Sequence, residues 1–240
     1  MPGMLDGKTA IVTGSSKGIG YAIAEALARE DANVVVSARH ADEVEEAAHA
    51  LDTMGAGRVV GVPCDMRSYD DVKRLIGAAR DLGGLDVLVN NAGVGGFAPI
   101  DQLSVEQWET IIGTNLTGVF YACREAVPHL RTRGGGWIIN IGSLAGKNPF
   151  AGGAAYNASK FGLLGFSEAM MLDVREHGIR VCCVMPGSVN THFNAKEPSP
   201  ENAWMIQPED IARLVMELLA FPENVLPSRI EIRPTRPRKH

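Results

Sequence analysis

Short apolar runs alternate with helix-like stretches along the whole chain, and this alternation restricts the fold more than any other feature. The apolar runs lie at residues 9–12, 34–36, 59–62, 87–89, 137–141, 181–184 and 230–232. The helix-like stretches lie at residues 21–29, 43–51, 72–79, 105–130, 156–176 and 208–219. Runs made mostly of Val and Ile are typical of strands covered on both faces, and helices between them imply parallel crossovers. The sequence therefore predicts an α/β fold with a doubly wound parallel sheet of about seven strands and helices on both faces.

Length and composition favour a single domain over residues 1–240. The chain has 240 residues and is 45% hydrophobic, which suits one large core and is short for two ordinary domains. Its four cysteines are scattered without a C-x-x-C pattern or a neighbouring His cluster, so neither a metal site nor a disulfide framework is expected. Cys182 and Cys183 stand inside an apolar run and are interpreted as small buried hydrophobic residues.

Charge and hydropathy bear on partners and location. With 23 basic and 28 acidic side chains the formal net charge is −5, and no basic stripe precedes the short tail at 236–240. We interpret that tail as a frayed terminus, and nucleic acid is not expected as a partner. The amino-terminal residues lack the pattern of a secretory signal, and no apolar run reaches membrane-spanning length. The sequence therefore predicts a soluble cytoplasmic protein that does not bind membranes.

A glycine-rich turn, Thr-Gly-Ser-Ser-Lys-Gly-Ile-Gly at residues 13–20, follows the first apolar run and leads directly into a helical stretch. Glycines let the backbone approach a pyrophosphate, whose charge would rest on the free N–H groups at the start of that helix. The spacing lacks the Gly-Lys-Ser/Thr ending of a nucleoside triphosphatase loop, so that class is excluded. The alternative is a tight glycine turn without a ligand. At the first strand-to-helix turn of a parallel sheet, the pattern predicts a Rossmann-type dinucleotide site contacted by Gly14, Ser16, Lys17, Gly18, Ile19 and Gly20.

The end of the second apolar run bears on which nicotinamide dinucleotide binds. An Asp or Glu about 20 residues after the loop normally holds the ribose hydroxyl of NAD. Arg39 stands there instead and can bind a 2′-phosphate, while Lys17 adds a second cation. NADP(H) is therefore the expected cofactor, and the alternative is that both side chains are ordinary surface charges. After the third apolar run, Asp65 and Met66 are placed to meet the adenine, although Asp65 can equally cap the next helix.

A tyrosine and a lysine four residues apart, Tyr156 and Lys160, form the candidate reacting pair because they share one helix face. An ordinary phenol has a pKa of about 10, and a nearby ammonium lowers that pKa and prepares the phenol to exchange a proton with a carbonyl or alcohol. Tyr69 and Lys73 have the same spacing, but no serine-bearing strand end accompanies them, and we assign them no catalytic role. Ser143 follows the fifth apolar run, where its hydroxyl can stabilise an alkoxide. A turn or cap residue is the alternative for Ser143.

Six motifs, in matching order and spacing, resemble the short-chain dehydrogenases/reductases over essentially the whole chain. They are Thr13-Gly14-x-x-x-Gly18-Ile19-Gly20, Asn90-Asn91-Ala92-Gly93, Asn115, Ser143, Tyr156-x-x-x-Lys160 and Pro186-Gly187. Within the family, the chain looks most like the NADPH-dependent 3-oxoacyl-acyl-carrier-protein reductases. The basic Arg-Pro segment at 233–238 departs from their pattern.

The resemblance implies a role for each matching residue. Tyr156 would be the proton donor and acceptor, and Lys160 would lower its pKa and hold the nicotinamide ribose. Asn115 would bind a water in a proton relay, since an amide inside a helical stretch can interrupt the helix; a simple kink is the alternative. Thr191 would clamp the nicotinamide carboxamide or else cap a helix. The remaining expected cofactor contacts are Asn91, Ala92, Gly93, Pro186, Gly187 and Val189.

Substrate selectivity is expected in the loops at about 94–99, 144–150 and 188–208. Phe97, Phe150, Phe193 and Trp204 predict apolar walls there. His192 either orients an anionic group of the substrate or lies on the surface.

The expected function is NADPH-dependent reduction of a small ketone or aldehyde. One alternative is an alcohol dehydrogenase that works oxidatively, and another is a dinucleotide-sensing protein without turnover. The intact Ser143, Tyr156 and Lys160 argue against the sensor, which needs no proton donor. Small and apolar residues on the helices expected at 105–130 and 156–176 exceed what one sheet face covers, which predicts a homodimer or homotetramer as in the family.

Overall fold

One parallel sheet runs through the part of the chain that the computed structural model describes, residues 3–194 and 197–236. Its seven strands have the order β3-β2-β1-β4-β5-β6-β7, and every pairing is parallel. Crossover connections therefore join the strands, and the predicted doubly wound α/β fold is confirmed. The strands are β1 Thr9–Thr13, β2 Asn33–Ser37, β3 Val59–Gly61, β4 Val87–Asn90, β5 Gly136–Ile141, β6 Ile179–Pro186 and β7 Arg229–Ile232.

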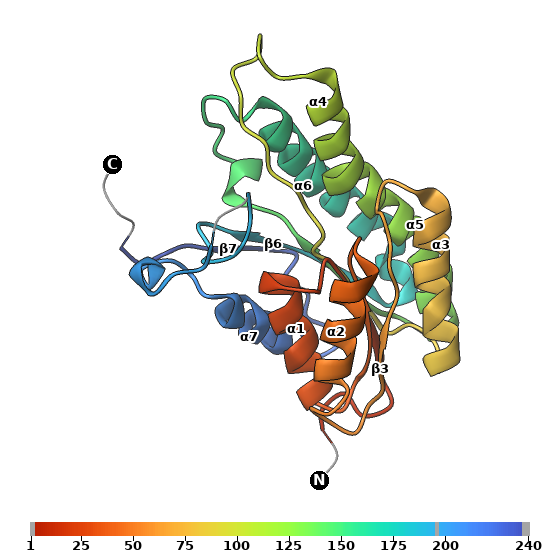
Figure 1. Cartoon of the computed structure of the whole chain (residues 1–240). Helices are drawn as coiled ribbons and strands as arrows, with labels where there is room; N and C mark the ends of the chain where they lie inside the picture. The colour runs from red at the N-terminus through yellow and green to blue at the C-terminus, as the bar shows by residue number, and fades with distance from the viewer. Residues whose placement is uncertain (1–2, 195–196, 237–240) are drawn as a thin grey trace.

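Helices cover both faces of the sheet (Figure 1). One layer contains α1, α2 and α7, and the other contains α3, α5 and α6, with α4 packed against α6. The helices are α1 Gly18–Arg29, α2 Ala41–Leu51, α3 Tyr69–Gly77, α4 Val105–Ile112, α5 Gly118–Thr132, α6 Ala154–Val174 and α7 Pro208–Leu219. Shorter helical turns lie at Ala78–Leu82, Leu144–Gly146, Arg175–His177 and Pro200–Asn202.

The core is split in two by the sheet, as the period of two along each strand requires. On β1, Val12 packs with the α1, α2 and α7 layer, whereas its neighbour Ile11 packs with α3, α5 and α6. Neither side chain is exposed, and each fully buried residue of this size contributes about 1.5–3 kcal/mol. Burial on both faces explains why Val and Ile recur in strands such as β2 and β5. Cys182 and Cys183 are buried and free, as predicted.

The segment predicted as one helix over residues 105–130 contains a change of helix type. A π-helical turn, Gly113–Thr117, separates α4 from α5. Asn115 stands in this turn with no exposed surface, and its side chain bonds to a neighbouring loop and helix. The helical stretch expected at 105–130 is therefore present, and its α-helical pattern is interrupted at Asn115, as expected of an amide inside a helix.

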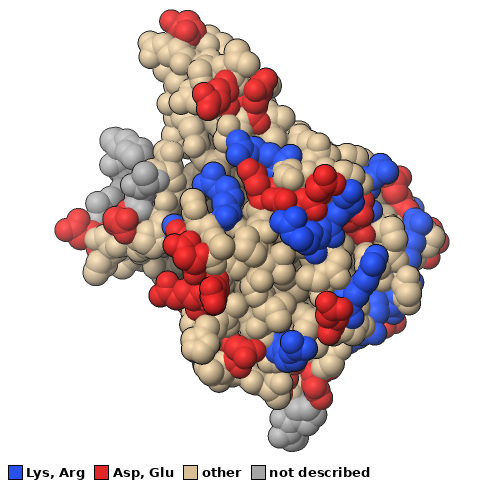
Figure 2. Space-filling model, turned by 45° about the vertical axis from the view of Figure 1, so that its right-hand side comes forward, with Lys and Arg blue, Asp and Glu red and all other residues tan. Residues whose placement is uncertain are grey.

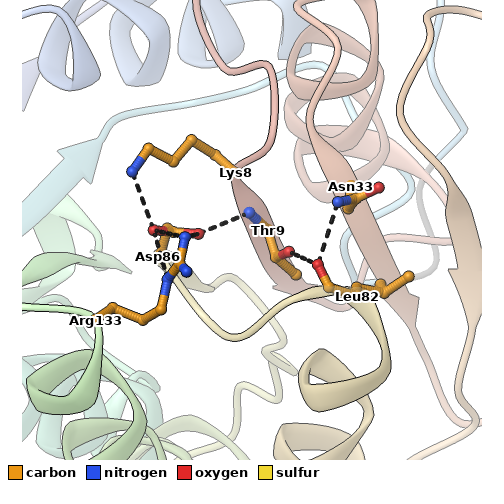
Figure 3. Close-up of polar contacts among 6 residues, drawn as sticks. All are labelled: Lys8, Thr9, Asn33, Leu82, Asp86 and Arg133. Atoms are coloured by element: carbon orange, nitrogen blue, oxygen red, sulfur yellow. Dashed lines mark hydrogen bonds and ion pairs between the residues drawn. The ribbon is translucent and has the colours of Figure 1, made fainter.

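A buried acid ties the amino ends of the central strands together. Asp86, which precedes β4, accepts hydrogen bonds from Thr9 N at 3.0 Å and from the Arg133 guanidinium at 3.1–3.2 Å (Figure 3). Lys8 Nζ lies 3.3 Å from the same carboxylate. Leu82 O accepts from Thr9 Oγ1 at 2.7 Å. This network lies at the strands' amino ends and leaves the opposite edge of the sheet for ligands.

Basic and acidic side chains are interspersed on the face seen in Figure 2. Two of the ion pairs on α3 are Lys73–Asp70 and Arg74–Asp71, at 2.7 and 3.1 Å. Within the described residues, no helix combines the length and apolar character needed to cross a bilayer. Of the basic tail at 236–240, only Arg236 belongs to the described part of the chain.

Candidate functional site

A cavity of about 750 Å³ lies at the carboxyl edge of the sheet. The ends of β1, β2, β4, β5 and β6 contribute to its wall. Every predicted cofactor residue lines it except Gly20, and so do Ser143, Tyr156 and Lys160. Gly20 and Asn115 lie behind the wall rather than in it. The fold therefore brings together, in one hollow, side chains that the sequence separates by more than a hundred positions.

The conformation of the phosphate loop requires glycine at positions 14 and 20, where a side chain would collide with neighbouring backbone atoms. Gly14 has φ +63°, and a Cβ there would meet Ala92 Cα at 2.8 Å. A Cβ on Gly20 would lie 2.3 Å from Gly14 O, so Gly20 permits the close turn rather than a ligand contact. Lys17 starts α1 in an extended conformation, and no side chain caps the first turn of that helix. Its N–H groups can therefore receive an anion from the cavity.

The far end of the cavity, at β2 and α2, is charged. Arg39 is exposed, and no carboxylate among the described residues forms an ion pair with it. Lys17 Nζ lies 3.5 Å from Glu43 Oε1. Sequence reasoning missed Glu43, although its place in the first turn after β2 puts it at the same sheet edge.

Asp65 also lines this end of the cavity. Hydrogen bonds from Arg67 hold the pKa of the Asp65 carboxyl below its usual range. Ser68 caps α3 by accepting from Asp71 N, so the alternative of Asp65 as the helix cap was wrong. Met66 lies beside Asp65 in the wall.

The residues after β4 hold the cavity wall in place. Asn91 Nδ2 donates to Thr13 O at 3.0 Å and to Gly14 O at 2.8 Å, which ties this segment to the phosphate loop. Asn90 Nδ2 donates to Asn140 Oδ1 at 2.8 Å and links β4 to β5.

Tyr156 and Lys160 lie one turn apart on α6, and both are almost fully buried. Lys160 Nζ is 5.8 Å from the centroid of the Tyr156 ring and donates to Ile141 O at 2.9 Å. Desolvation lowers the pKa of Lys160 to about 8.

Burial raises the pKa of Tyr156, and a hydrogen bond with Ser143 opposes that rise. The predicted lowering by Lys160 was therefore wrong for this arrangement, because burial dominates and the ammonium is directed to Ile141 O. Ser143 Oγ also accepts from Ala145 N at 3.1 Å. The serine therefore stabilises a turn and also lines the cavity.

Asn115 supports the site from behind. Its Oδ1 accepts from Val94 N at 2.8 Å, and its Nδ2 donates to Val94 O and to Ser159 Oγ, both at 3.0 Å. The side chain thus joins the loop after β4 to α6. Within the π turn, Gly118 N donates to Gly113 O, a bond that spans five residues instead of the four of a regular α-helix.

The end of the cavity beside Tyr156 is aromatic. The rings of Phe97 and Phe193 lie with their centroids 5.7 Å from that of Tyr156, and Phe150 packs edge-on against Phe97 at 5.3 Å. Phe97 and Phe193 line the cavity; Phe150 and Trp204 do not. His192 lies in the cavity wall with Nδ1 3.2 Å from Glu197 Oε2.

Between the aromatic end and the phosphate loop, the segment after β6 completes the wall with Pro186, Gly187, Val189 and Thr191. Thr191 Oγ1 accepts from Phe193 N at 3.3 Å, and no helix begins there, so the helix-cap alternative for Thr191 was wrong.

Tyr69 and Lys73, the second pair with catalytic spacing, lie outside this cavity. The Tyr69 hydroxyl donates to Glu125 Oε1 at 2.5 Å, and Lys73 pairs with Asp70. No group of three or more potential metal ligands is found within residues 3–194 and 197–236.

Comparison with known proteins agrees with this geometry. The family model described as short chain dehydrogenase matches residues 8–202. The 3beta-hydroxysteroid dehydrogenase 1 of Eggerthella lenta is 40% identical over 196 residues, which are 80% of this chain and 75% of that protein.

Two solved structures resemble almost the entire chain. A metagenomic short-chain oxidoreductase in complex with NADP is 36% identical with a TM-score of 0.85, covering 97% of this chain and 99% of that one. An alcohol dehydrogenase from the archaeon Thermococcus sibiricus, complexed with 5-hydroxy-NADP, is 28% identical with a TM-score of 0.90 and the same two coverages. With the family model matching most of its length and its chemistry-bearing side chains gathered in one cavity, the chain belongs to the short-chain dehydrogenase family.

Proposed function

We propose that the protein transfers hydride between NADP(H) and a carbonyl or alcohol substrate, with reduction as the physiological direction. The observation that carries this proposal is the single cavity that joins Arg39 and Lys17 at one end to Ser143 and Tyr156 at the other. The two structural neighbours in complex with NADP or 5-hydroxy-NADP support the choice of cofactor.

The cavity suits an elongated dinucleotide. The glycine cradle at Gly14 and the uncapped start of α1 would hold the pyrophosphate, and Arg39 with Lys17 would bind the 2′-phosphate. Asp65 and Met66 would contact the adenine. Asn91, Ala92 and Gly93 would pass close to the adenosine ribose. The nicotinamide would lie among the remaining contacts, Tyr156, Lys160, Pro186, Gly187, Val189 and Thr191.

The bound cofactor supplies the hydride, and the protein's own residues handle the oxygen and its proton. Ser143 would donate a hydrogen bond to the substrate oxygen, which stabilises the negative charge that develops there. Tyr156 would deliver the proton to that oxygen. Its raised pKa keeps the phenol protonated at neutral pH, the form required for a donor in the reductive direction.

After Tyr156 has given its proton to the substrate, a new proton would reach it through Lys160. Lys160, with its pKa near 8, can gain and lose a proton close to neutral pH. We propose that a water held by a free carbonyl of the π turn around Asn115 links this ammonium to solvent. The side chain of Asn115 positions that turn by its bonds to Val94 and Ser159.

The substrate is proposed to be a neutral, largely apolar ketone or aldehyde. Phe97 and Phe193 flank the Tyr156 ring, and the nearby His192 already has Glu197 as a partner. An apolar ring or chain would gain burial there, whereas an anionic substrate would find its nearest histidine engaged.

We further propose a homo-oligomer formed through α4, α5 and α6. Their outer surfaces carry exposed Val105, Trp108, Phe120, Phe161 and Leu172. Large apolar side chains gathered on adjacent helices are typical of an interface between copies of a chain.

The decisive test replaces Tyr156 with phenylalanine, which removes one oxygen. Tyr156→Phe should abolish oxidation of NADPH with a panel of apolar ketones and aldehydes, while the affinity for NADPH, measured by fluorescence titration, stays within about twofold. Tyr69→Phe is the matched control and should retain full turnover. Substantial activity in Tyr156→Phe would sink the mechanism.

A further inference from the structure

The carboxylate of Glu43 faces the phosphate loop from the first turn of α2. Its Oε2 accepts from Ser16 Oγ at 3.0 Å, and its Oε1 lies 3.5 Å from Lys17 Nζ. The side chain is only 38% exposed and lines the same cavity as Arg39. An acid in the first turn of a helix ordinarily gains from the helix dipole alone, but this one is directed across to another element.

Lys17 is also one of the two cations proposed to receive the 2′-phosphate of the cofactor, and Ser16 precedes it in the phosphate loop. Glu43 thus makes the contacts that a phosphate at this end of the cavity would make. Asp65, the other acid at this end, differs because Arg67 binds it at 2.6 Å and compensates its charge. The cation beside Glu43 is Lys17, and a bound phosphate would compete for it.

We propose that Glu43 is a specificity-determining residue that weakens the preference for NADP(H) over NAD(H). The inference rests on the proposed 2′-phosphate site at Arg39 and Lys17. A phosphate has to displace the carboxylate from Ser16 and Lys17 and then remain near a like charge. A free 2′-hydroxyl meets no such repulsion and can donate a hydrogen bond to the same carboxylate.

Neutralising Glu43 should therefore favour the phosphorylated ligand alone. A carboxylate and a phosphate a few ångströms apart at a partly exposed site repel each other enough to change a dissociation constant about tenfold. Glu43→Gln keeps the side-chain length and an acceptor for Ser16, so the loop retains its main contact.

The test measures binding directly, by isothermal titration calorimetry with two ligands that differ only in the 2′-phosphate: adenosine 2′,5′-bisphosphate and 5′-AMP. In Glu43→Gln the dissociation constant for the bisphosphate should fall about tenfold, while that for 5′-AMP stays equal or rises. Glu45→Gln removes the same charge from an exposed position of the same helix, outside the cavity, and should change the ratio of the two constants less than twofold.

Arg39→Ala separates this inference from the proposed function. If Arg39→Ala abolishes the preference for the bisphosphate and Glu43→Gln leaves the ratio unchanged, the role of Glu43 is overturned and the phosphate site stands. If the wild-type protein binds both ligands equally and Arg39→Ala has no effect, both proposals are overturned. The role of Glu43 is supported if Glu43→Gln, but not Glu45→Gln, raises the dissociation constant for 5′-AMP divided by that for the bisphosphate.

Discussion

At the scale of single residues, Lys160 carries a charge in a place that disfavours it. Its ammonium is buried and donates to one backbone carbonyl, and desolvation lowers its pKa from 10.5 to about 8. By the free-energy equivalent of a pKa shift, holding the charged form in the folded state at neutral pH costs about 3 kcal/mol. A group placed at such a cost is typical of functional sites.

The linkage between protonation and folding makes this cost measurable. The unfolded chain keeps Lys160 protonated up to about pH 10.5, whereas the folded protein releases the proton near pH 8, so this residue's contribution to stability rises with pH between those values. Lys160→Met removes the effect. The free energy of unfolding of the wild type relative to Lys160→Met should therefore increase by about 3 kcal/mol between pH 7 and 10.5, measured by urea denaturation.

Titrations of groups that do not interact with Lys160 occur in both proteins and cancel in that difference. The pKa of Cys183 is raised by burial and lowered in part by Lys160, so the titration of Cys183 is the one that differs between the two proteins. Lys73→Met is the control, because Asp70 raises the pKa of Lys73 instead of lowering it, so this exposed residue contributes no rise in stability between those values. A wild-type minus Lys160→Met difference that stays flat with pH would contradict the buried, charged state described for Lys160.

At the scale of elements, the π turn between α4 and α5 shows how one buried amide shapes a helix. Asn115 uses both side-chain heteroatoms on partners outside its own helix, Val94 and Ser159. These bonds connect the loop after β4, which carries the cavity wall, to the helix that carries Tyr156. The π turn thus connects the part of the site that would bind the cofactor to the part that contains Tyr156.

Removing the Asn115 amide should weaken the connection between the loop after β4 and α6. Asn115→Ala leaves Val94 N and O, which are half-buried, without their partners, and the expected loss is about 2–4 kcal/mol in the free energy of unfolding. Amide hydrogen exchange at Val94 should accelerate. Asn148→Ala, at an exposed position, should change stability by less than about 0.5 kcal/mol. Unchanged exchange at Val94 would show that the loop is held by other contacts.

At the scale of the whole molecule, α4, α5 and α6 carry exposed apolar side chains, and this is the surface through which we propose that copies of the chain associate. Phe161, 44% exposed, directly follows Lys160 on α6, and Phe120 lies on α5 with its ring 6.4 Å from that of Phe166. An interface here would stabilise the helix that positions Tyr156 and Lys160.

A charge on this face should therefore separate the subunits. Phe161→Glu is expected to shift the mass measured by light scattering from an oligomer to a monomer, because burial of a carboxylate among apolar side chains is costly. Phe221→Glu is the control, since Phe221 is similarly exposed at 40% but follows α7 in the other layer. A monomeric wild type at micromolar concentration would rule out the proposed oligomer.

The sequence by itself determined the order of the elements, the parallel sheet and the position of the phosphate loop. These follow from local physics: strands buried on both faces favour Val and Ile, as at Val34–Val36, and the left-handed backbone at residue 14, with φ +63°, favours glycine. The Tyr156 and Lys160 spacing was readable for the same reason, since the helix period alone places them on one face.

The pKa values and the hydrogen-bond partners of those side chains depend on the tertiary structure. The pKa of Tyr156 rises because the folded chain buries it, the π turn forms because Asn115 reaches Val94 and Ser159, and Glu43 meets Ser16 across two separate elements. Desolvation and long-range hydrogen bonds depend on which atoms surround a group in space. Neighbours in the chain do not specify that surrounding, so no local pattern reports it.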